Sequence, residues 1–358
     1  MDTAFGRLAF ERGFVTDRQL RRLREESDRG RTRLRQVLVQ EGLLTLEEFC
    51  EILKELQLRR APTQRFACTA PGKWIGGYRI VREIAHGGMG VVYEAEDPRF
   101  SRHVAIKTVR GLERDEFASE LLRREGAIQA QLSPPRVPAV YGTGIDGGRP
   151  YLVMEYVEGP TLADLIDRRA PIREIVRILE HVAETVGLAH DKGIIHADLK
   201  PANVIAASDG RVVLADFGLA HWKGQTAGRP GEIVGTPLYM APEQVRMERE
   251  IDPRADVWAL GVILHEAATG RNPFEGYSTS RIADRIVGER PPPLGDPGLE
   301  SICRGALEKD RRSRTSDGRE FARQLRRWRE GRPVRAGRLS RWWSRTGARL
   351  ATGLLGSA

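Results

Sequence analysis

The chain has 358 residues and a mass of 40.1 kDa, which allows one large domain and a smaller one. Apolar residues make up 40% of it, and no apolar run approaches the roughly 18 residues that a membrane-spanning helix needs. The first residues, MDTAFGRLAFER, have no apolar signal-peptide core. The three cysteines, Cys50, Cys68 and Cys303, form no CxxC pair and no metal spacing. These features argue against a membrane, secreted or zinc-binding protein, and we expect a cytoplasmic one.

The net charge of +9 is concentrated at the ends of the chain. Residues 331–358 contain six arginines and no acidic residue, whereas residues 1–60 contain 13 basic and 11 acidic side chains. The 270 residues between them carry a net charge of only +1. Because most of the positive charge belongs to a tail, we expect no specific nucleic-acid partner.

Residues 1–60 contain an internal repeat with a constant offset of 29 residues, in which the segment 5–16 recurs as 34–45. Each copy is typical of a short helix, a turn at a glycine and a second helix, with Thr16 or Thr45 as the N-cap of the second helix. Two copies together can bury a core that one copy cannot, so the repeat predicts a small helical domain.

Residues 61–77 are rich in proline and glycine and are predicted to be a linker. From Tyr78 onward the β-rich stretches YRIVREIA, GVVYEAEDP and RHVAIKTV follow. A helix is expected around Glu113–Leu132, a buried strand at YLVMEYV, and mainly helical periodicity beyond Leu162. A strand-rich third before a helix-rich remainder predicts an α+β fold with two lobes packed across a cleft.

A glycine-rich segment, AHGGMGVVY at 85–93, lies between two of the predicted strands. Glycines there allow a hairpin to approach phosphate oxygens closely, although many such hairpins are purely structural. Lys107 lies on a strand 17 residues after Gly90, and Glu125 lies in the helical segment LLRREGAIQAQL. A Lys–Glu pair would hold the ammonium group against the α- and β-phosphates of a nucleotide.

The strongest signal is the segment HADLKPAN at 196–203, followed by DFG at 216–218. With these motifs in this order, the chain resembles the eukaryotic-like, or Hanks-type, protein kinase superfamily from Tyr78 to Trp328, in particular its bacterial Ser/Thr kinases. The resemblance implies a bilobal kinase fold over residues 78–330, with an antiparallel sheet and one helix in the N-lobe and a mainly helical C-lobe. It also implies transfer of the γ-phosphoryl group of ATP, with Mg²⁺ or alternatively Mn²⁺, to Ser/Thr hydroxyls of protein substrates in bacterial signalling.

The resemblance assigns roles to the motif residues. Asp198 would be the catalytic base that orients the substrate hydroxyl and accepts its proton. Lys200 would neutralise charge on the γ-phosphate, and Asn203 and Asp216 would hold the metal ions. Phosphoryl transfer needs such groups because it depends on alignment and charge neutralisation more than on covalent help.

The resemblance also implies a nucleotide site between the glycine-rich hairpin and the hinge. Its expected contacts are Ile84, Ala85, His86, Gly87, Gly88, Met89, Gly90, Val92, Ala105, Lys107, Glu155 and Val157. Lys107 belongs at the same time, with Glu125, to the catalytic set, and Met154 stands at the gatekeeper position.

Other matches are implied to be architectural or to select the acceptor. The segment GTPLYMAPE, which resembles the end of a kinase activation segment, closes at Glu243, and Glu243 would pair with Arg314. Asp256 would brace the catalytic loop. Lys200 and Thr236 together follow the Ser/Thr pattern rather than the tyrosine kinase pattern.

Two residues depart from the family pattern. Ala85 stands where the first loop glycine is usual, which predicts altered nucleotide affinity. Ala197 replaces an arginine that, in the family, makes charge-assisted hydrogen bonds to a phosphorylated residue of the activation loop. Thr226 is the only hydroxyl residue between Asp216 and Gly235. We therefore expect activity that does not depend on loop phosphorylation.

The repeat resembles the N-terminal domain of type II secretion ATPases and related bacterial sensors, some of which bind cyclic-di-GMP. The offset of 29 residues fits, but Ala4–Gly6 and Arg33–Arg35 each keep only part of the nucleotide-contacting triplet. A docking or dimerisation module is the reading we favour, and a sensor for a cyclic dinucleotide or regulatory protein is the alternative. The tail, residues 331–358, mixes arginine with Trp342 and Trp343 and predicts either disorder or peripheral contact with an anionic membrane.

Two rivals to an active kinase stay open. A nucleotide-binding pseudokinase scaffold would be favoured if Lys107, Asp198, Asn203 or Asp216 were missing, and all four are present. A second-messenger sensor with the kinase as its output predicts that a ligand of the repeat changes the kinase rate.

Overall fold

A computed structural model of the chain describes residues 2–12, 15–16, 19, 22, 72–86, 90–109, 116–132, 134–218, 220–222, 237–246, 248 and 250–334. Its helices and strands are, in chain order, α1 (Asp2–Glu11), β1 (Trp74–Ile75), β2 (Tyr78–His86), β3 (Gly90–Asp97), β4 (Arg102–Val109), α5 (Glu116–Gln131), β5 (Val140–Asp146), β6 (Arg149–Glu155), α6 (Leu162–Asp167), α7 (Ile172–Asp191), β7 (Ile194–Ile195), β8 (Val204–Ala206), β9 (Val212–Leu214), β10 (His221–Trp222), α8 (Pro242–Val245), α9 (Arg254–Thr269), α10 (Thr279–Gly288), α11 (Pro297–Ala306) and α12 (Gly318–Arg329).

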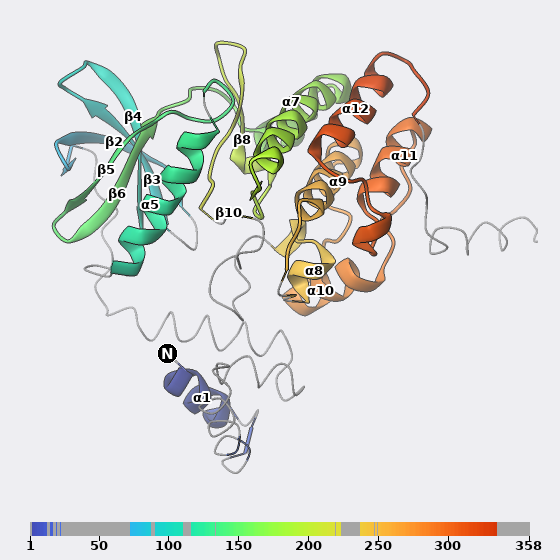
Figure 1. The fold of residues 1–358 in the computed structure, drawn as a ribbon, viewed down its shortest axis with the longest axis horizontal. Coiled ribbons are helices and arrows are strands. Elements are labelled where there is room, and N and C mark those ends of the chain that lie inside the picture. The colour runs from blue at the N-terminus through green and yellow to red at the C-terminus, as the bar shows by residue number, and fades with distance from the viewer. Residues whose placement is uncertain are drawn as a thin grey trace, which may run out of the picture.

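The first lobe is built on an antiparallel sheet with the strand order β1-β2-β3-β4-β6-β5 (Figure 1). Strand β1 lies inside the predicted linker, because Trp74 pairs with Arg79 and the Gly72 amide donates to the Ile80 carbonyl at 2.8 Å. The linker predicted for residues 61–77 therefore ends in a strand of the sheet.

The two faces of this sheet bury different side chains, because successive residues of a strand point to opposite sides. One face packs a cluster of Ile80, Val91, Tyr93, Ala95, Val104, Ile106 and Val153. The other face packs Ala105, Leu152 and Met154 against Leu122 of α5. This contact fixes α5, the helix that carries Glu125, against the strands that lead to the hinge.

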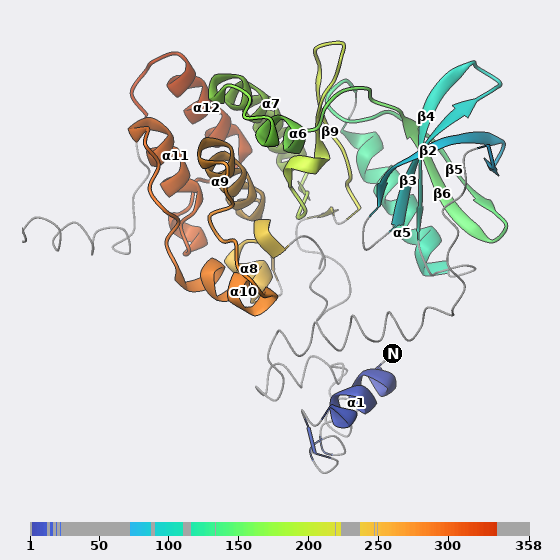
Figure 2. The ribbon, with the colours of Figure 1, turned by 180° about the vertical axis from the view of Figure 1, so that it is seen from behind.

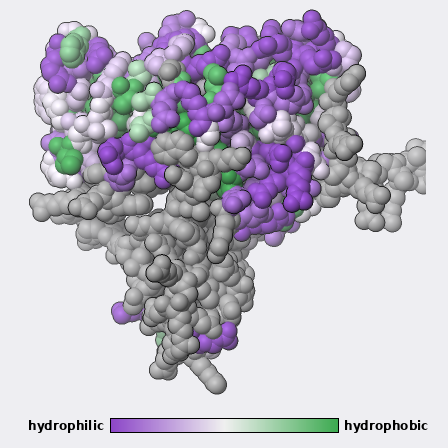
Figure 3. Space-filling model, in the orientation of Figure 1, coloured by the Kyte–Doolittle hydropathy of each residue, from purple (hydrophilic) through white to green (hydrophobic). Residues whose placement is uncertain are grey.

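The second lobe is organised around α9, which is buried on all sides from Ala255 to His265. Helices α7, α11 and α12 contact it (Figure 2). Helix α7 is buried over most of its surface and leaves exposed only a stripe that includes Arg173, Arg177 and Leu188. The face of this lobe seen in Figure 3 is mainly hydrophilic. The predicted two-lobed α+β fold is confirmed, and no helix within the described residues is long and apolar enough to cross a membrane.

Part of the first repeat copy is described. Helix α1 buries Leu8 and Ala9, and the Thr16 hydroxyl accepts a hydrogen bond from the Gln19 amide at 3.3 Å. The Thr16 amide in turn donates to Gln19 Oε1 at 2.9 Å, the pair of hydrogen bonds that a capping box makes. Most of the helix predicted to follow Thr16 lies outside the described residues. The second copy, with Thr45, and the part of the tail from residue 335 onward, with its tryptophans, lie outside the described residues, as do Cys50 and Cys68. Cys303 is a free, buried thiol.

Candidate active site

The sheet register aligns the glycine-rich hairpin with the predicted lysine. Ala85 on β2 lies opposite Val92 on β3, and Val92 lies opposite Lys107 on β4. A Cβ atom at Gly90 would lie only 1.8 Å from the Thr108 carbonyl oxygen, so the close approach of β3 and β4 requires glycine there. The hairpin tip, residues 87–89, lies outside the described residues, which leaves Gly87, Gly88 and Met89 as sequence predictions.

The remaining predicted nucleotide contacts lie on the same strands or at the hinge. Ile84 and His86 are exposed on β2, and Ala105 is buried opposite Met154 in the β4–β6 register. Val157 is half-buried just beyond β6. Their role as nucleotide contacts stays a prediction from the sequence.

Glu155 at the hinge does more than the sequence indicated. Its carboxylate accepts from the Ala139 amide at 3.1 Å and from Arg211 Nη2 at 2.8 Å, and its own amide donates to the Ala139 carbonyl at 2.8 Å. Arg211 precedes β9, the strand that leads to Asp216. The hinge is thus connected to the hairpin of β8 and β9 in the C-lobe. No sequence motif at Arg211 predicts this contact.

Lys107 joins the two lobes. Its ammonium group lies 2.7 and 2.8 Å from the Glu125 carboxylate of α5 and 2.6 Å from Asp216 Oδ1. Burial alone would lower the pKa of Lys107, but the charges of Glu125 and Asp216 outweigh burial and raise the pKa above its ordinary value. The lysine is therefore a fixed positive charge, almost fully buried between the two carboxylates.

Asp216 combines an uncommon backbone conformation with a lowered pKa and a partly exposed side chain. Its backbone has a φ of 65°, in the left-handed region that aspartate tolerates better than most residues. Burial alone would raise the pKa of Asp216, but the Lys107 charge and hydrogen bond outweigh it and lower the pKa to about 2. Its side chain is 38% exposed, so an ionised carboxylate is accessible from solvent at neutral pH.

The loop that carries Asp198 is held by its own neighbours. Lys200 Nζ lies 2.9 Å from Asp198 Oδ2, and Asn203 Nδ2 donates to the Asp198 carbonyl at 3.0 Å. The Ala215 amide donates to the Asn203 carbonyl at 2.8 Å, which connects this loop to the residue before Asp216. The structure thus brings together the four candidate residues of the motifs HADLKPAN and DFG, which are Asp198, Lys200, Asn203 and Asp216.

Asp256 on α9 braces this loop from below, as predicted. Its carboxylate accepts from the His196 amide at 2.9 Å and from the Ala197 amide at 2.8 Å. It also lies 2.9 Å from Nε2 of His190, a buried histidine at the end of α7 that sequence reasoning missed. Burial would raise the pKa of Asp256, but these hydrogen bonds and the two histidines lower it.

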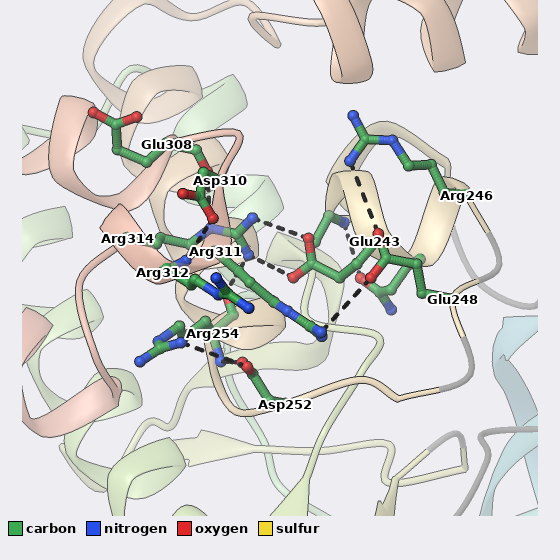
Figure 4. A network of polar contacts seen from close by, with 12 residues as sticks. Glu243, Arg246, Glu248, Asp252, Arg254, Glu308, Asp310, Arg311, Arg312 and Arg314 are labelled. Atoms are coloured by element: carbon green, nitrogen blue, oxygen red, sulfur yellow. Dashed lines mark hydrogen bonds and ion pairs between the residues drawn. The ribbon is translucent and has the colours of Figure 1, made fainter. Parts of the chain in front are cut away.

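The predicted pair of Glu243 and Arg314 is formed (Figure 4). Arg314 Nη1 and Nη2 donate to the two carboxylate oxygens at 2.6 and 2.9 Å, and both side chains are almost fully buried. Arg314 also donates to the carbonyls of Glu308 and Arg254. These bonds fix α8 onto the C-lobe.

The oxygen donors fit a divalent cation. Asn203 uses its amide nitrogen on the loop, and Asp216 uses Oδ1 on Lys107, which leaves the Asn203 amide oxygen and Asp216 Oδ2 for a hard ion such as Mg²⁺. A carboxylate with a pKa of about 2 remains an acceptor throughout the physiological pH range. The residues present therefore suit the metal that the sequence implies.

Comparisons with known proteins identify the family of the chain. The Protein kinase domain family matches residues 78–325. The chain is 37% identical over 267 residues to a probable serine/threonine-protein kinase PknB of Bifidobacterium longum, covering 69% of this chain and 39% of that protein. It is 36% identical over 279 residues to the serine/threonine-protein kinase PknB of Mycolicibacterium smegmatis, covering 74% and 44%. The chain therefore spans less than half the length of these curated relatives.

Among solved structures, the chain is similar to the Mycobacterium tuberculosis PknI kinase domain, with 28% identity and a TM-score of 0.56. The alignment covers 72% of this chain and 98% of that domain.

Proposed function

Because the chain belongs to the protein kinase family, we propose that it is an active Ser/Thr protein kinase, with the kinase domain over residues 78–330, that acts in bacterial signalling. The observation that carries the proposal is the position of Lys107, bonded at once to Glu125 of the N-lobe helix and Asp216 of the C-lobe. This contact supports the proposal because it joins the lysine and the carboxylate that would hold the phosphates and the metal ion.

Each residue then has a distinct task. Lys107 holds the α- and β-phosphates of ATP. Asp198 orients the acceptor hydroxyl and takes its proton as the new O–P bond forms, while the bond from the γ-phosphorus to the β–γ bridging oxygen breaks and ADP leaves. Lys200, 2.9 Å from Asp198, neutralises charge on the γ-phosphoryl oxygens. Asn203 and Asp216 would hold Mg²⁺, which would supply positive charge that offsets the charge of the phosphates.

The acceptor class follows from the loop beside the base. Lys200 two residues after Asp198, with Thr236 in the activation segment, is the Ser/Thr pattern, although Thr236 lies outside the described residues. The substrates are therefore proteins that present serine or threonine hydroxyls.

The test is transfer of labelled phosphate from Mg·ATP to the chain itself and to a generic basic protein. Asp198→Asn should lower kcat about 100-fold or more, because general base catalysis contributes on that order. Asp284→Asn, at an exposed position of α10 in the same lobe, is the control and should label like the wild type. Equal labelling by Asp198→Asn and the wild type would refute the catalytic assignment.

The N-terminal repeat is proposed to be a docking or dimerisation unit of the type found in secretion ATPases, supported by helix α1 and the Thr16 cap. A sensor role would show as a change in kinase rate on addition of cyclic-di-GMP, and no change would favour docking. A cytoplasmic location is proposed, with peripheral membrane contact through residues 331–358 tested by sedimentation with anionic vesicles.

A further inference from the structure

The peptide before the catalytic base has an uncommon conformation. Ala197 has a φ of 63°, in the left-handed region that a residue with a Cβ atom rarely adopts. Such a conformation persists only where the surroundings fix it, and the Ala197 amide is fixed by Asp256 at 2.8 Å. Because Ala197 leads directly into Asp198, whatever holds this peptide also sets the direction of the base.

The carbonyl of the same residue is held from the other side. Gln244 Nε2 donates to the Ala197 carbonyl oxygen at 2.9 Å, across 47 residues of chain. Ala197 is only 9% exposed, so this acceptor has little access to water as a substitute partner.

Gln244 belongs to α8, at the end of the activation segment. Its Oε1 accepts from the Ala241 amide at 2.9 Å, so one side-chain amide spans the end of the segment and the catalytic loop. The two contacts determine which end of the amide is which, because a flipped group would set donor against donor and acceptor against acceptor. The backbone of α8 beside Gln244 is held in place, because both carboxylate oxygens of the adjacent Glu243 accept hydrogen bonds from Arg314 (Figure 4).

We propose that Gln244 is a positioning residue that couples the end of the activation segment to the loop carrying Asp198. This inference rests on the proposed kinase function. The connection uses a neutral amide and a backbone carbonyl, and the methyl group of Ala197 offers nothing to a phosphoryl group. The catalytic loop is therefore held in place without a charge added to the activation segment.

The test compares Gln244→Met with the wild type. Methionine keeps the length and volume of the side chain but makes neither hydrogen bond, so kcat should fall about tenfold to hundredfold. The Kd for a non-hydrolysable Mg·ATP analogue should stay within twofold, because Gln244 lies on the acceptor side of the cleft. The matched control is Gln324→Met, the same change at a buried C-lobe glutamine that donates to Glu320 at 3.2 Å within α12.

Gln244→Glu gives a second readout that a purely structural role would not move. A protonated glutamate can donate to the Ala197 carbonyl and accept from the Ala241 amide, whereas an ionised one can only accept. The ratio of variant to wild-type kcat should therefore rise as the pH falls from 7 to 5, toward the ordinary glutamate pKa of about 4.3. This profile decides the question if Gln244→Met does not fold.

The outcomes are distinct. A folded Gln244→Met protein with kcat within twofold of the wild type, or Gln244→Glu with a flat ratio, would overturn the role of Gln244 while leaving the kinase assignment intact. A wild-type protein with no phosphotransfer would overturn the proposed function, and this inference with it.

Discussion

The candidate site has a nucleotide half, around Lys107, and an acceptor half, around Asp256 and Glu243. The charged groups of the two halves differ in exposure and in the number of their hydrogen-bond partners. In the nucleotide half, Lys107 bridges Glu125 and Asp216, and the Asp216 side chain is still 38% exposed. In the acceptor half, Asp256 and Glu243 are almost fully buried, and every carboxylate oxygen of these two residues has at least one partner.

This difference separates charged groups that are available to a ligand from charged groups that only hold other parts of the protein in position. In the proposed function, the Lys107 cluster exchanges a contact for a phosphate or a metal ion, because the Asp216 side chain is 38% exposed and its Oδ2 is not used by Lys107. Asp256 and Glu243 have no such capacity, so their charges serve architecture. Exposure and unused acceptor sites, rather than charge itself, distinguish the two groups.

The largest effect is expected at the nucleotide half. Lys107→Met removes the positive charge from both carboxylates and from the phosphates, and kcat/KM for ATP should fall about 100-fold or more in a steady-state assay. Lys73→Met, at an exposed N-lobe position, should leave kcat/KM unchanged. Activity of Lys107→Met close to that of the wild type would remove the basis for assigning chemistry to this cluster.

Breaking the acceptor-half pair should instead cost stability. Glu243→Gln leaves the buried Arg314 without its carboxylate, which should lower the free energy of unfolding by about 3 kcal/mol in a denaturant titration. The matched change Glu120→Gln breaks an exposed pair with Arg123 and should cost less than about 1 kcal/mol. Equal losses in the two variants would contradict the distinction between buried and exposed pairs.

A smaller effect on stability than that of Glu243→Gln is expected from the titration of Lys309. Burial and then the charges of Arg314 and Arg246 lower the pKa of Lys309 from 10.5 to about 7, although the rings of Trp258 and Phe274 lie 4.6 and 4.5 Å from its Nζ. The two aromatic faces favour the charged form, but removing the ammonium from water outweighs them.

Between pH 7 and 10.5 the unfolded chain therefore binds more protons at Lys309 than the folded chain, and stability rises with pH. From pH 7 to 9 the gain should be roughly 2 kcal/mol, and it should be missing from Lys309→Met. The measurement is chemical unfolding of both proteins across this range. Parallel curves would show that Lys309 keeps an ordinary pKa.

The smallest effect is expected at Thr226, which lies outside the described residues. Because Ala197 cannot bond a phosphoryl group and its carbonyl is already held by Gln244, Thr226→Ala should change kcat less than twofold. Mass spectrometry of the wild type would establish whether Thr226 is modified at all. A drop of tenfold or more would identify the loop as a phosphorylation switch.

Much of the site could be predicted from the sequence because motif letters specify partners as well as residues. Lys107 with Glu125, and Glu243 with Arg314, were predicted as pairs, and both are formed although 71 residues separate the second pair. The strands around the hairpin were also predictable, since alternating apolar residues and glycine turns mark them locally.

The positioning residues could not be found in this way. His190 and Arg211 lie outside the quoted motifs, and Gln244 looks like an ordinary polar residue of a short helix. Their roles depend on which carbonyl or carboxylate the fold brings within 3 Å, as for His190 and Asp256 at 2.9 Å. Strand β1 was missed for a similar reason, because two residues pair with β2 without any periodicity to announce them.

The contact at Gly90 affects how variants of the glycine-rich hairpin should be interpreted. A side chain there would collide with the Thr108 carbonyl, so Gly90→Ala would push β3 away from β4 before any nucleotide arrives. Such a variant would mimic an ATP-binding defect while its origin is damage to the sheet. Melting curves of the nucleotide-free protein separate the two causes, since a variant that loses only phosphate contacts melts like the wild type when no nucleotide is present.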